Sequence, residues 1–190
     1  VLHYNGTTNG ATMQGDLTLE GSGDPTFGST EVRGEDPLKV WAQKLADMGV
    51  ERIEGRLIGD DNVFDDQPYP GGWTVDYITE QKGRYMGNSA GGLTYRDNVV
   101  PVTVRATRPG APPSVEVQPE NAVSITNRAT TSSRWRGNTL QVNRTFSTNE
   151  LVLTGSVARS YSGTVAVPVS DPTAFVLQSF ERRLQEAGIE

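Results

Sequence analysis

The segment at residues 52–66, RIEGRLIGDDNVFDD, runs from an apolar strand into a turn that carries four aspartates. Ile53, Leu57 and Ile58 are the apolar positions that predict the strand. The turn aspartates are Asp60, Asp61, Asp65 and Asp66. Ligands of open parallel sheets usually bind beyond the carboxyl ends of the strands, so this acidic turn is the first candidate for a functional site.

A strand and a helix precede this segment. Residues 16–20 alternate apolar and polar side chains, which predicts a strand. Asp36 suits the N-cap of the helix, Pro37 its first position and Gly49 its end. The apolar stripe of the helix, at spacings of three and four, consists of Leu38, Trp41, Leu45 and Met48. Strand, helix and strand in this order predict a βαβ unit with parallel strands and a right-handed crossover.

The remaining segments differ from this unit. Residues 1–15 are polar and rich in turn signals such as Asn5-Gly6 and Asn9-Gly10. Residues 97–163 show no helical period, and their short alternating apolar runs predict a small β-sandwich or barrel. The runs lie at residues 100–104, 115–117, 123–125, 140–142, 151–153 and, beyond this segment, 165–169.

A second helix opens with the same signal as the first, Asp171 followed by Pro172, and Gly188 ends it. Its stripe consists of Leu177, Phe180, Leu184 and Ala187. We therefore expect an α/β plus all-β fold. A small discontinuous α/β domain, residues 1–96 and 164–190, contains the parallel βαβ unit, and a β-sandwich or barrel-like domain, residues 97–163, interrupts it.

Composition excludes several classes of protein. The net charge of −6 argues against nucleic acid and anionic membrane surfaces as partners, because both require a basic patch. The absence of cysteine excludes disulfides, zinc thiolate sites and cysteine nucleophiles. No apolar run reaches the roughly 20 residues that cross a bilayer. The sequence has no initiator Met and no signal peptide, so we interpret it as a piece or processed form of a longer protein.

The acidic turn admits several chemistries. Its aspartates could bind calcium, although the EF-hand spacing and central Gly are missing. Paired carboxylates could also act as in a glycosidase. A third alternative is a solvated turn in which Asp60 braces the end of the strand. The last is a carboxylate that faces a cationic group of a ligand.

Other candidate residues carry weaker signals. His3 is the only histidine, so a Ser-His-Asp triad would have to use it, and the alternative is a solvated surface residue. Ser147-Thr148-Asn149 fits the three-residue catalytic pattern Ser-x-Asn. It lies in a turn between β runs, and we interpret it as a chance match. No lysine follows a serine at the Ser-x-x-Lys spacing, and none begins a Lys-Thr-Gly. Trp41 and Trp73 are predicted to be packing residues.

Four short signatures occur in order: GDLTL at 15–19, GSGDP at 21–25, IEGRLIGDD at 53–61 followed by Phe64, and GW at 72–73. This order and spacing resembles the class C low-molecular-mass penicillin-binding proteins, the D-alanyl-D-alanine carboxypeptidases and endopeptidases of peptidoglycan. The resemblance continues more loosely through Asn98, Pro109-Gly110 and the helix that opens at Asp171. It covers nearly the whole chain.

The resemblance implies a nested architecture. In that family, a serine transpeptidase-like domain is interrupted after its Ser-x-x-Lys helix by an α/β domain, which a β-rich domain interrupts in turn. This chain resembles the insertion alone, with the nucleophile before Val1 and the Lys-Thr-Gly element after Glu190. The resemblance implies an extracytoplasmic, serine-type parent enzyme that needs no cofactor or metal and acts on peptidoglycan stem peptides. This chain itself would hold no catalytic residue.

One substrate contact is also implied by the resemblance. In several relatives the aspartate that ends the Leu-Ile strand, with a nearby aromatic residue, meets the free amino group of the stem-peptide diamino acid. The matching positions here are Asp60 and Phe64, with adjacent Asp61 as an alternative register. The segment at 88–93, NSAGGL, departs from the Ser-Ala-Leu-like run of the family.

Three functional hypotheses follow. The first is an accessory, non-catalytic part of a D-alanyl-D-alanine carboxypeptidase or endopeptidase that helps to shape the substrate cleft. The alternative is a free-standing extracellular module that binds glycan or protein through the β-rich domain, around Arg134, Trp135 and Arg136. The third is a small hydrolase built on the aspartate cluster.

Overall fold

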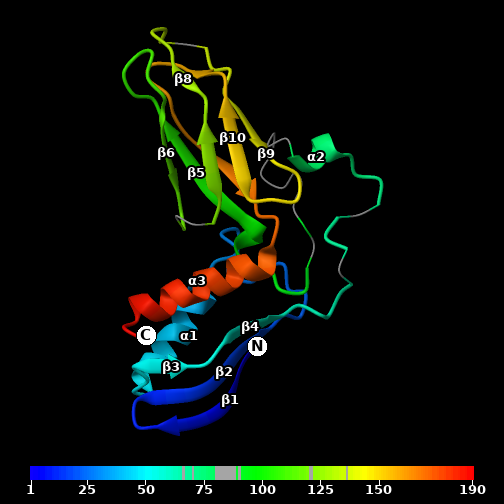
Figure 1. The fold of residues 1–190 in the computed structure, drawn as a ribbon, viewed down its shortest axis with the longest axis vertical. Coiled ribbons are helices and arrows are strands. Elements are labelled where there is room, and N and C mark those ends of the chain that lie inside the picture. Colours follow the sequence, from blue (N-terminus) through cyan, green and yellow to red (C-terminus); the bar gives the residue numbers. More distant parts are fainter. Residues whose placement is uncertain (66, 70, 80–88, 90, 120–121, 136) are drawn as a thin grey trace. The chain divides into compact units, whose positions relative to one another are not determined.

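The computed structural model describes residues 1–190 except 66, 70, 80–88, 90, 120–121 and 136 (Figure 1). The helices are α1 (Pro37–Asp47), α2 (Val75–Thr79), α3 (Pro172–Glu186) and the 3-10 turn η1 (Arg96–Asn98). The strands are β1 (Leu2–Asn9), β2 (Thr12–Glu20), β3 (Arg52–Glu54), β4 (Leu57–Asp60), β5 (Val99–Arg105), β6 (Ser114–Val117), β7 (Ser124–Asn127), β8 (Thr130–Thr131), β9 (Gln141–Arg144), β10 (Glu150–Thr154), β11 (Ser156–Val157) and β12 (Ser162–Pro168).

The chain divides into two compact units. Unit 1 consists of Val1–Pro68, Ala90–Asp97 and Asp171–Glu190, and unit 2 of Tyr69–Ser89 and Asn98–Ser170. The boundary expected between residues 163 and 164 falls inside β12, which pairs with β5 along its whole length. Residues 69–89 also belong with unit 2. The units therefore differ from the expected domain ranges at these two places.

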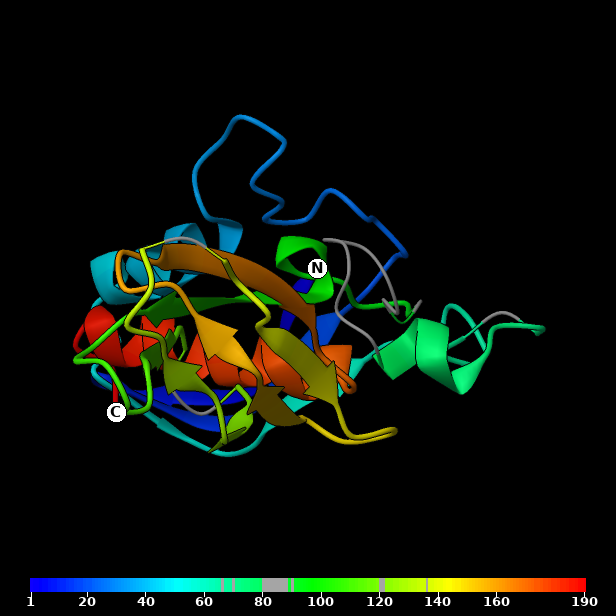
Figure 2. The same ribbon diagram turned by 90° about the horizontal axis from the view of Figure 1, so that it is seen from above.

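Unit 1 is a mixed sheet with two helices. β2 pairs in antiparallel fashion with β1 and in parallel fashion with β3 and β4. α1 lies in the connection from β2 to β3, and both α1 and α3 lie on the same face of the sheet (Figures 1 and 2). The buried residues of this layer come from β2, α1 and α3, and include Leu17, Leu19, Leu38, Leu45, Phe175, Val176 and Phe180.

The first strand corrects the expectation for residues 1–15. β1 pairs with β2 from Leu2 opposite Leu19 to Asn9 opposite Thr12, so the segment is half of a hairpin. Its turn contains Gly10, whose φ of 59° lies in the left-handed region that suits glycine. Most side chains of β1 are exposed and polar, so the segment lacks the alternation that would have revealed a strand.

The strand expected at Ile53, Leu57 and Ile58 is divided into β3 and β4. Between them, Leu17 N donates to Arg56 O at 2.9 Å, and Arg56 N donates to the Asp16 carboxylate at 2.9 Å. A Cβ on Gly55 would lie 1.9 Å from the carbonyl oxygen of Gly15. The chain can approach β2 this closely only because residue 55 is glycine.

The predicted helix boundaries are confirmed. The carboxylates of Asp36 and Asp171 accept from Leu38 N and Ala174 N, and a proline opens each helix. The predicted stripe is wrong at Met48, which is 77% exposed because it is the C-cap of α1 and lies past the last buried turn. On α3, Leu177 and Ala187 are only half-buried.

Rings from the two helices and a loop fill the space between α1 and α3. Trp41 packs against Phe27 at a ring-centroid distance of 5.3 Å and edge-on against Phe180 at 6.2 Å. Tyr95 contacts Phe27 and Phe175 at 6.0 and 5.9 Å. Such aromatic pairs add to the stabilisation from buried area. The predicted packing role of Trp41 is confirmed.

Unit 2 is predominantly β. Its described strands form the sheets β12-β5-β6 and β7-β10-β9 and the pair β11-β8. They do not close into a barrel, so the barrel alternative is not supported in the described part of the chain. Each predicted apolar run lies in or beside one of these strands. The core side chains with no exposed surface include Val100, Val102, Val104, Leu151, Leu153, Val157 and Val167.

The arm of residues 69–79, which contains α2, is fixed to unit 2 by a buried arginine. Arg144 of β9 is 2% exposed, and its Nη2 donates to Tyr69 Oη at 3.1 Å and to Ile78 O at 3.2 Å. Trp73 contacts Tyr77 edge-on at 4.7 Å, which confirms its packing role. From the sequence we also expect Tyr85 to be an aromatic anchor of this irregular stretch, but it lies outside the described residues. Among the helices described, none is both long and apolar enough to cross a membrane.

Candidate functional site

Asp60 ends β4 at the carboxyl edge of the parallel strands. Its Cα lies opposite that of Glu20, the last residue of β2, and its carbonyl oxygen accepts from Gly21 N at 2.8 Å. The carboxylate accepts from Asn62, from Nδ2 at 2.6 Å and from the backbone N at 3.2 Å. These bonds hold the pKa of Asp60 below its usual value. An ionised carboxylate therefore stands at the strand end, and its only hydrogen-bond partner among the described residues is Asn62.

The other predicted site residues are Asp61 and Phe64, and their surroundings differ. The Asp61 carboxylate accepts from Thr173 Oγ1 at 2.5 Å, which ties the turn to the first turn of α3. Phe64 is 54% exposed, and its ring lies over Gly23, where a Cβ would approach it to 2.6 Å. Asp61 therefore has a structural partner, whereas Asp60 and Phe64 present surface to solvent.

Glycines allow three segments to meet at this site. A Cβ on Gly21 would lie 2.2 Å from the carbonyl oxygen of Gly92, and a Cβ on Gly92 would lie 2.2 Å from that of Asp61. Gly23 N also donates to Gly92 O at 2.8 Å. The glycines of the GSGDP signature thus bring the ends of β2 and β4 against residues 91–93 by direct backbone contact.

The aspartates do not gather around one point. Asp65 accepts from Gln67 N at 3.3 Å, while Asp60 and Asp61 bond to Asn62 and Thr173. Asp66 lies outside the described residues. Within the described part of the chain, no group of three acidic or histidine side chains is arranged to hold a metal ion. The calcium hypothesis therefore has no support from the residues described.

A cavity of about 260 Å³ adjoins the GSGDP turn. Leu19, Phe27, Trp41 and Leu93 give it apolar walls, and Glu20, Ser22 and Asp24 contribute polar groups. The Asp24 carboxylate accepts from both the backbone N and the Oγ1 of Thr26, at 2.8 and 2.6 Å. The residues of the GSGDP turn therefore have two roles. They reverse the chain after β2, and they form part of the wall of this cavity.

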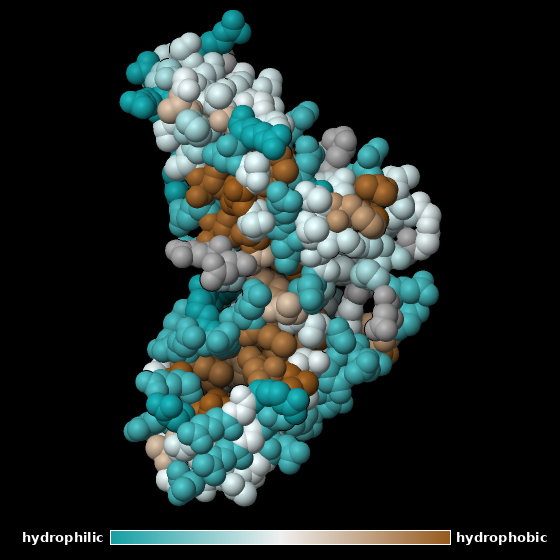
Figure 3. Space-filling model, viewed as in Figure 1, coloured by the Kyte–Doolittle hydropathy of each residue, from teal (hydrophilic) through white to brown (hydrophobic). Residues whose placement is uncertain are grey.

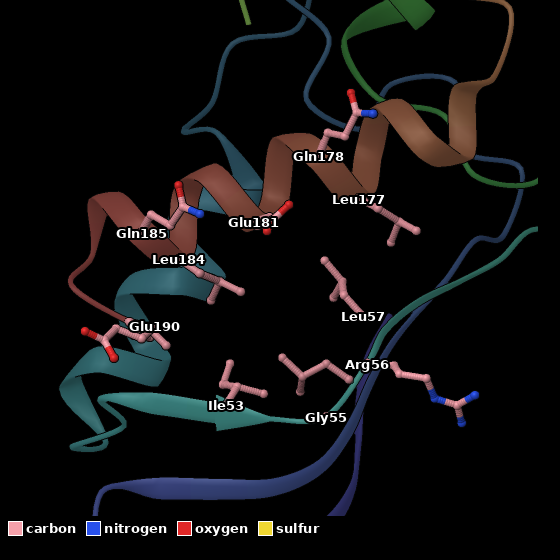
Figure 4. Close-up of a pocket in the computed structure, with 12 residues that line it drawn as sticks. Ile53, Gly55, Arg56, Leu57, Leu177, Gln178, Glu181, Leu184, Gln185 and Glu190 are labelled. Carbon is pink, nitrogen blue, oxygen red and sulfur yellow. The ribbon is translucent and has the colours of Figure 1, made fainter. Parts of the chain in front are cut away.

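A second cavity, of about 370 Å³, lies between α3 and the sheet of unit 1 (Figure 4). Leu177 and Leu184 point into it from the helix, and Ile53 and Leu57 from the sheet, whereas the Arg56 guanidinium points away. Apolar side chains are visible in this hollow, framed by polar ones, in the space-filling view (Figure 3). None of the predicted site residues lines it.

Asp36 has partners that the sequence did not reveal. Its Oδ2 accepts from Tyr95 Oη at 2.9 Å and from Arg183 Nη2 and Nε at 2.7 and 3.0 Å, and Arg96 Nη2 lies 3.4 Å away. Burial tends to raise the pKa of Asp36, but these hydrogen bonds and positive charges outweigh it and lower the pKa. The cluster joins α1, α3 and the loop before β5.

The other candidate residues have local partners. His3 Nε2 lies 2.6 Å from Glu20 Oε2 on the exposed hairpin. The Ser147-Thr148-Asn149 turn uses its asparagine to accept from Ser170 N and Oγ, both at 2.7 Å. A structural role therefore accounts for Asn149. Thr173 and Asn62, which orient the two site aspartates, were missed because their hydrogen bonds depend on the folded turn.

Comparison with known proteins identifies the family of this chain. A sequence model of the D-Ala-D-Ala carboxypeptidase 3 (S13) family matches residues 1–190. The D-alanyl-D-alanine carboxypeptidase of Actinomadura sp. (strain R39) is 28% identical over 187 residues, covering 92% of this chain and 32% of that protein. The chain thus spans about a third of the length of this relative.

Solved structures show the same fold. Penicillin binding protein 4 from Haemophilus influenzae matches all of this chain with a TM-score of 0.70 and 21% identity, over 40% of its own length. The same protein complexed with a β-lactam matches all of the chain with a TM-score of 0.62 and 18% identity, over 37% of its length. At these identities the match establishes the fold alone.

Proposed function

This chain belongs to the D-Ala-D-Ala carboxypeptidase 3 (S13) family, and we propose that it forms the non-catalytic accessory domains of a peptidoglycan D-alanyl-D-alanine carboxypeptidase or endopeptidase. The chain spans 32% of the length of its Actinomadura relative. The acyl-transfer chemistry, with its serine nucleophile, then belongs to the remainder of the parent protein, which acts outside the cytoplasm. Unit 2 serves as an inserted β-rich scaffold and unit 1 as the part that borders the substrate cleft.

The observation that carries the proposal is the state of Asp60. Its carboxylate stands at the carboxyl end of a parallel strand, is ionised, and is held in one orientation by Asn62. Ligands of parallel sheets bind at this edge. A fixed anion there is suited to pair with an ammonium group. We assign it the free amino group of the stem-peptide diamino acid, with Phe64 as the adjacent apolar surface.

The sequence motifs of a serine acyl-transfer site are missing from this chain. The sequence contains neither Ser-x-x-Lys nor Lys-Thr-Gly. Ser147-Thr148-Asn149 has its asparagine engaged with Ser170. We therefore expect labelled penicillin to react with the full-length parent and not with this chain. Covalent labelling of this chain alone would contradict the accessory role.

The substrate contact is tested by kinetics of the full-length parent. We would compare kcat/KM for a D-alanyl-D-alanine stem peptide whose diamino acid carries a free amine with that for the N-acetylated peptide. Asp60→Asn should lower the preference for the free amine about fivefold, because an exposed ion pair contributes little more than this. Asp65→Asn, in the same turn, is the control and should keep the preference. An unchanged preference in Asp60→Asn would refute the assignment.

A further inference from the structure

The charge of the chain is unevenly divided. Residues 98–170 contain seven arginines, three glutamates and neither lysine nor aspartate. This segment therefore has a net charge of +4, although the whole chain has −6. Residues 121–149 contain four of these arginines and no acidic residue. The total charge of the chain therefore does not describe the charge of this segment.

Three loops of unit 2 meet at one end of its sheets and carry part of this charge. Arg159 N donates to Arg134 O at 2.8 Å, which joins the loop after β11 to the loop after β8. Gly110 N donates to Thr131 O at 2.8 Å, which joins the loop after β5 to β8. Arg108, Arg134 and Arg159 thus project from connected loops, and none forms an ion pair with a residue that the structure describes.

An exposed indole lies beside two of these arginines, Arg134 and Arg159. Trp135 is 65% exposed, and the guanidinium carbon of Arg159 lies 5.0 Å from the centroid of its ring. The Trp135 carbonyl oxygen accepts from Ser160 Oγ at 3.4 Å, and Arg134 N donates to Ser132 Oγ at 3.1 Å. The backbone on both sides of the ring is thus tied down. A tryptophan this exposed gains little from packing in the folded chain.

We propose that Trp135, Arg134, Arg159 and Arg108 form a binding surface for an acidic polysaccharide, one whose sugar rings carry carboxylate or phosphate groups. The indole offers a flat apolar face to the C–H side of a sugar ring, and Arg159 already holds the ring in a fixed plane. The arginines, which pair with no acidic side chain in the described part of the chain, supply bidentate donors for the anionic substituents. This surface lies in unit 2 and does not depend on the role proposed for Asp60.

A polysaccharide fits these residues better than a nucleic acid does. Single-stranded nucleic acids bind to several aromatic platforms along a basic groove. Here the structure describes one exposed indole beside Arg134 and Arg159, on loops that are bonded to the loop of Arg108. A polymer with alternating sugar rings and anionic groups can use one stacking site and a few charges, and multivalent contact along a polymer then raises the affinity.

The test is binding of the full-length protein to defined polymers, followed by Trp fluorescence and calorimetry. The probes are a polyuronate, a phosphomannan, a neutral glucan and a single-stranded DNA of similar length. Binding to the polyuronate or to the phosphomannan supports the proposal and identifies the anionic group. Equal affinity for the neutral glucan, tighter binding of the DNA, or binding of none of the polymers would overturn it.

Variants separate the surface from the fold. Trp135→Ala should lower the affinity about tenfold, and Arg159→Gln or Arg134→Gln about threefold to fivefold with a weaker dependence on salt. Phe146→Ala removes a 46% exposed ring at the other end of β9, and Arg33→Gln makes the same charge change in unit 1. Both controls should bind as the unaltered protein does. Wild-type affinity in Trp135→Ala, with an unchanged circular dichroism spectrum, would refute the proposed surface.

Discussion

Arg183 of α3 holds the carboxylate of Asp36 with two nitrogens, Nη2 at 2.7 Å and Nε at 3.0 Å from the same oxygen. The other oxygen of Asp36 caps α1 by accepting from Leu38 N at 3.1 Å. Both side chains are 14% exposed. A single carboxylate therefore joins α1 to α3, at two residues that are 147 positions apart in the chain.

Asp36→Asn should lower the free energy of unfolding of unit 1 by about 2–3 kcal/mol. The variant keeps a capping oxygen for α1 but removes the buried one of the two carboxylates that Arg183 contacts, so the guanidinium keeps only Glu186, whose Oε2 lies 2.5 Å from Nη1. Urea unfolding can be followed by the fluorescence of Trp41 in a protein where Trp73 and Trp135 are phenylalanine. Asp47→Asn, at the exposed end of α1, should change little; an equal loss in both variants would contradict the role of the pair.

The same pair predicts an acid dependence. Because the pKa of Asp36 is lowered in the folded protein, its contribution to stability is present above the unfolded pKa and is lost as the pH falls through the folded value. The difference in unfolding free energy between the wild type and Asp36→Asn should therefore be largest near neutral pH and shrink below about pH 4. A difference that stays constant to pH 2 would show that ionisation of Asp36 is not involved.

The raised pKa of Tyr95 predicts that the stability of unit 1 falls at alkaline pH. Burial, together with the nearby Asp36 carboxylate, raises the pKa of Tyr95 to about 12 from an ordinary value of 10.0. A raised folded pKa gives stability that is fully present below pH 10 and is lost between pH 10 and 12. Tyr95→Phe should cost about 1 kcal/mol at pH 7 and abolish this part of the alkaline loss. Tyr77→Phe is the control, and a parallel decline in wild type and Tyr95→Phe would count against the assignment.

Local signals in the sequence predicted the helices well. Asp-Pro starts and glycine ends act within a few residues, so the bounds of α1 and α3 followed from neighbours alone. Strands such as β5, β9 and β10 were recognisable because one face of each is buried and the alternation survives. β1 was missed because its side chains are exposed on both faces, which removes that signal.

The candidate site was predictable only in part. The position of Asp60 followed from the end of an apolar strand, and the structure places it there. The partners of Asp36 and Asp61 lie 147 and 112 residues away in the chain, so no local pattern reveals them. The same holds for Gly21 and Gly92, whose contact depends on three segments that meet only in the fold. The sequence shows that both positions are glycine, but only the structure shows the backbone contact that requires glycine there.

Neighbouring glycines offer a matched test of this close approach. A Cβ on Gly92 would lie 2.2 Å from the backbone oxygen of Asp61, whereas a Cβ on Gly91 would meet nothing within 4 Å. Gly92→Ala should therefore destabilise unit 1 by about 2–4 kcal/mol, since backbone on both sides must move. Gly91→Ala should be within about 0.5 kcal/mol of the wild type. Equal melting temperatures for the two variants would contradict the contact described at the end of β4.

Arg144 tests how the arm of residues 69–79 is held in unit 2. Its Nη2 donates to Tyr69 Oη and Ile78 O inside the unit, and the side chain is 2% exposed. Arg144→Met fills a similar volume but removes the donors, so the Ile78 carbonyl loses a buried partner, which costs about 1–3 kcal/mol. We expect amide hydrogen exchange of α2 to accelerate more than that of β10 in this variant.

The matched control is Arg105→Met, because Arg105 lies in the same unit but pairs with Glu116 on the surface at 2.7 Å. It should leave exchange in the arm unchanged, since exposed ion pairs contribute little to stability. Peptide-resolved mass spectrometry distinguishes the two variants. Uniform acceleration over all of unit 2 in Arg144→Met would mean that this arginine supports the sheet as a whole. Acceleration confined to the arm would show that its hydrogen bonds to Tyr69 and Ile78 fix that segment in place.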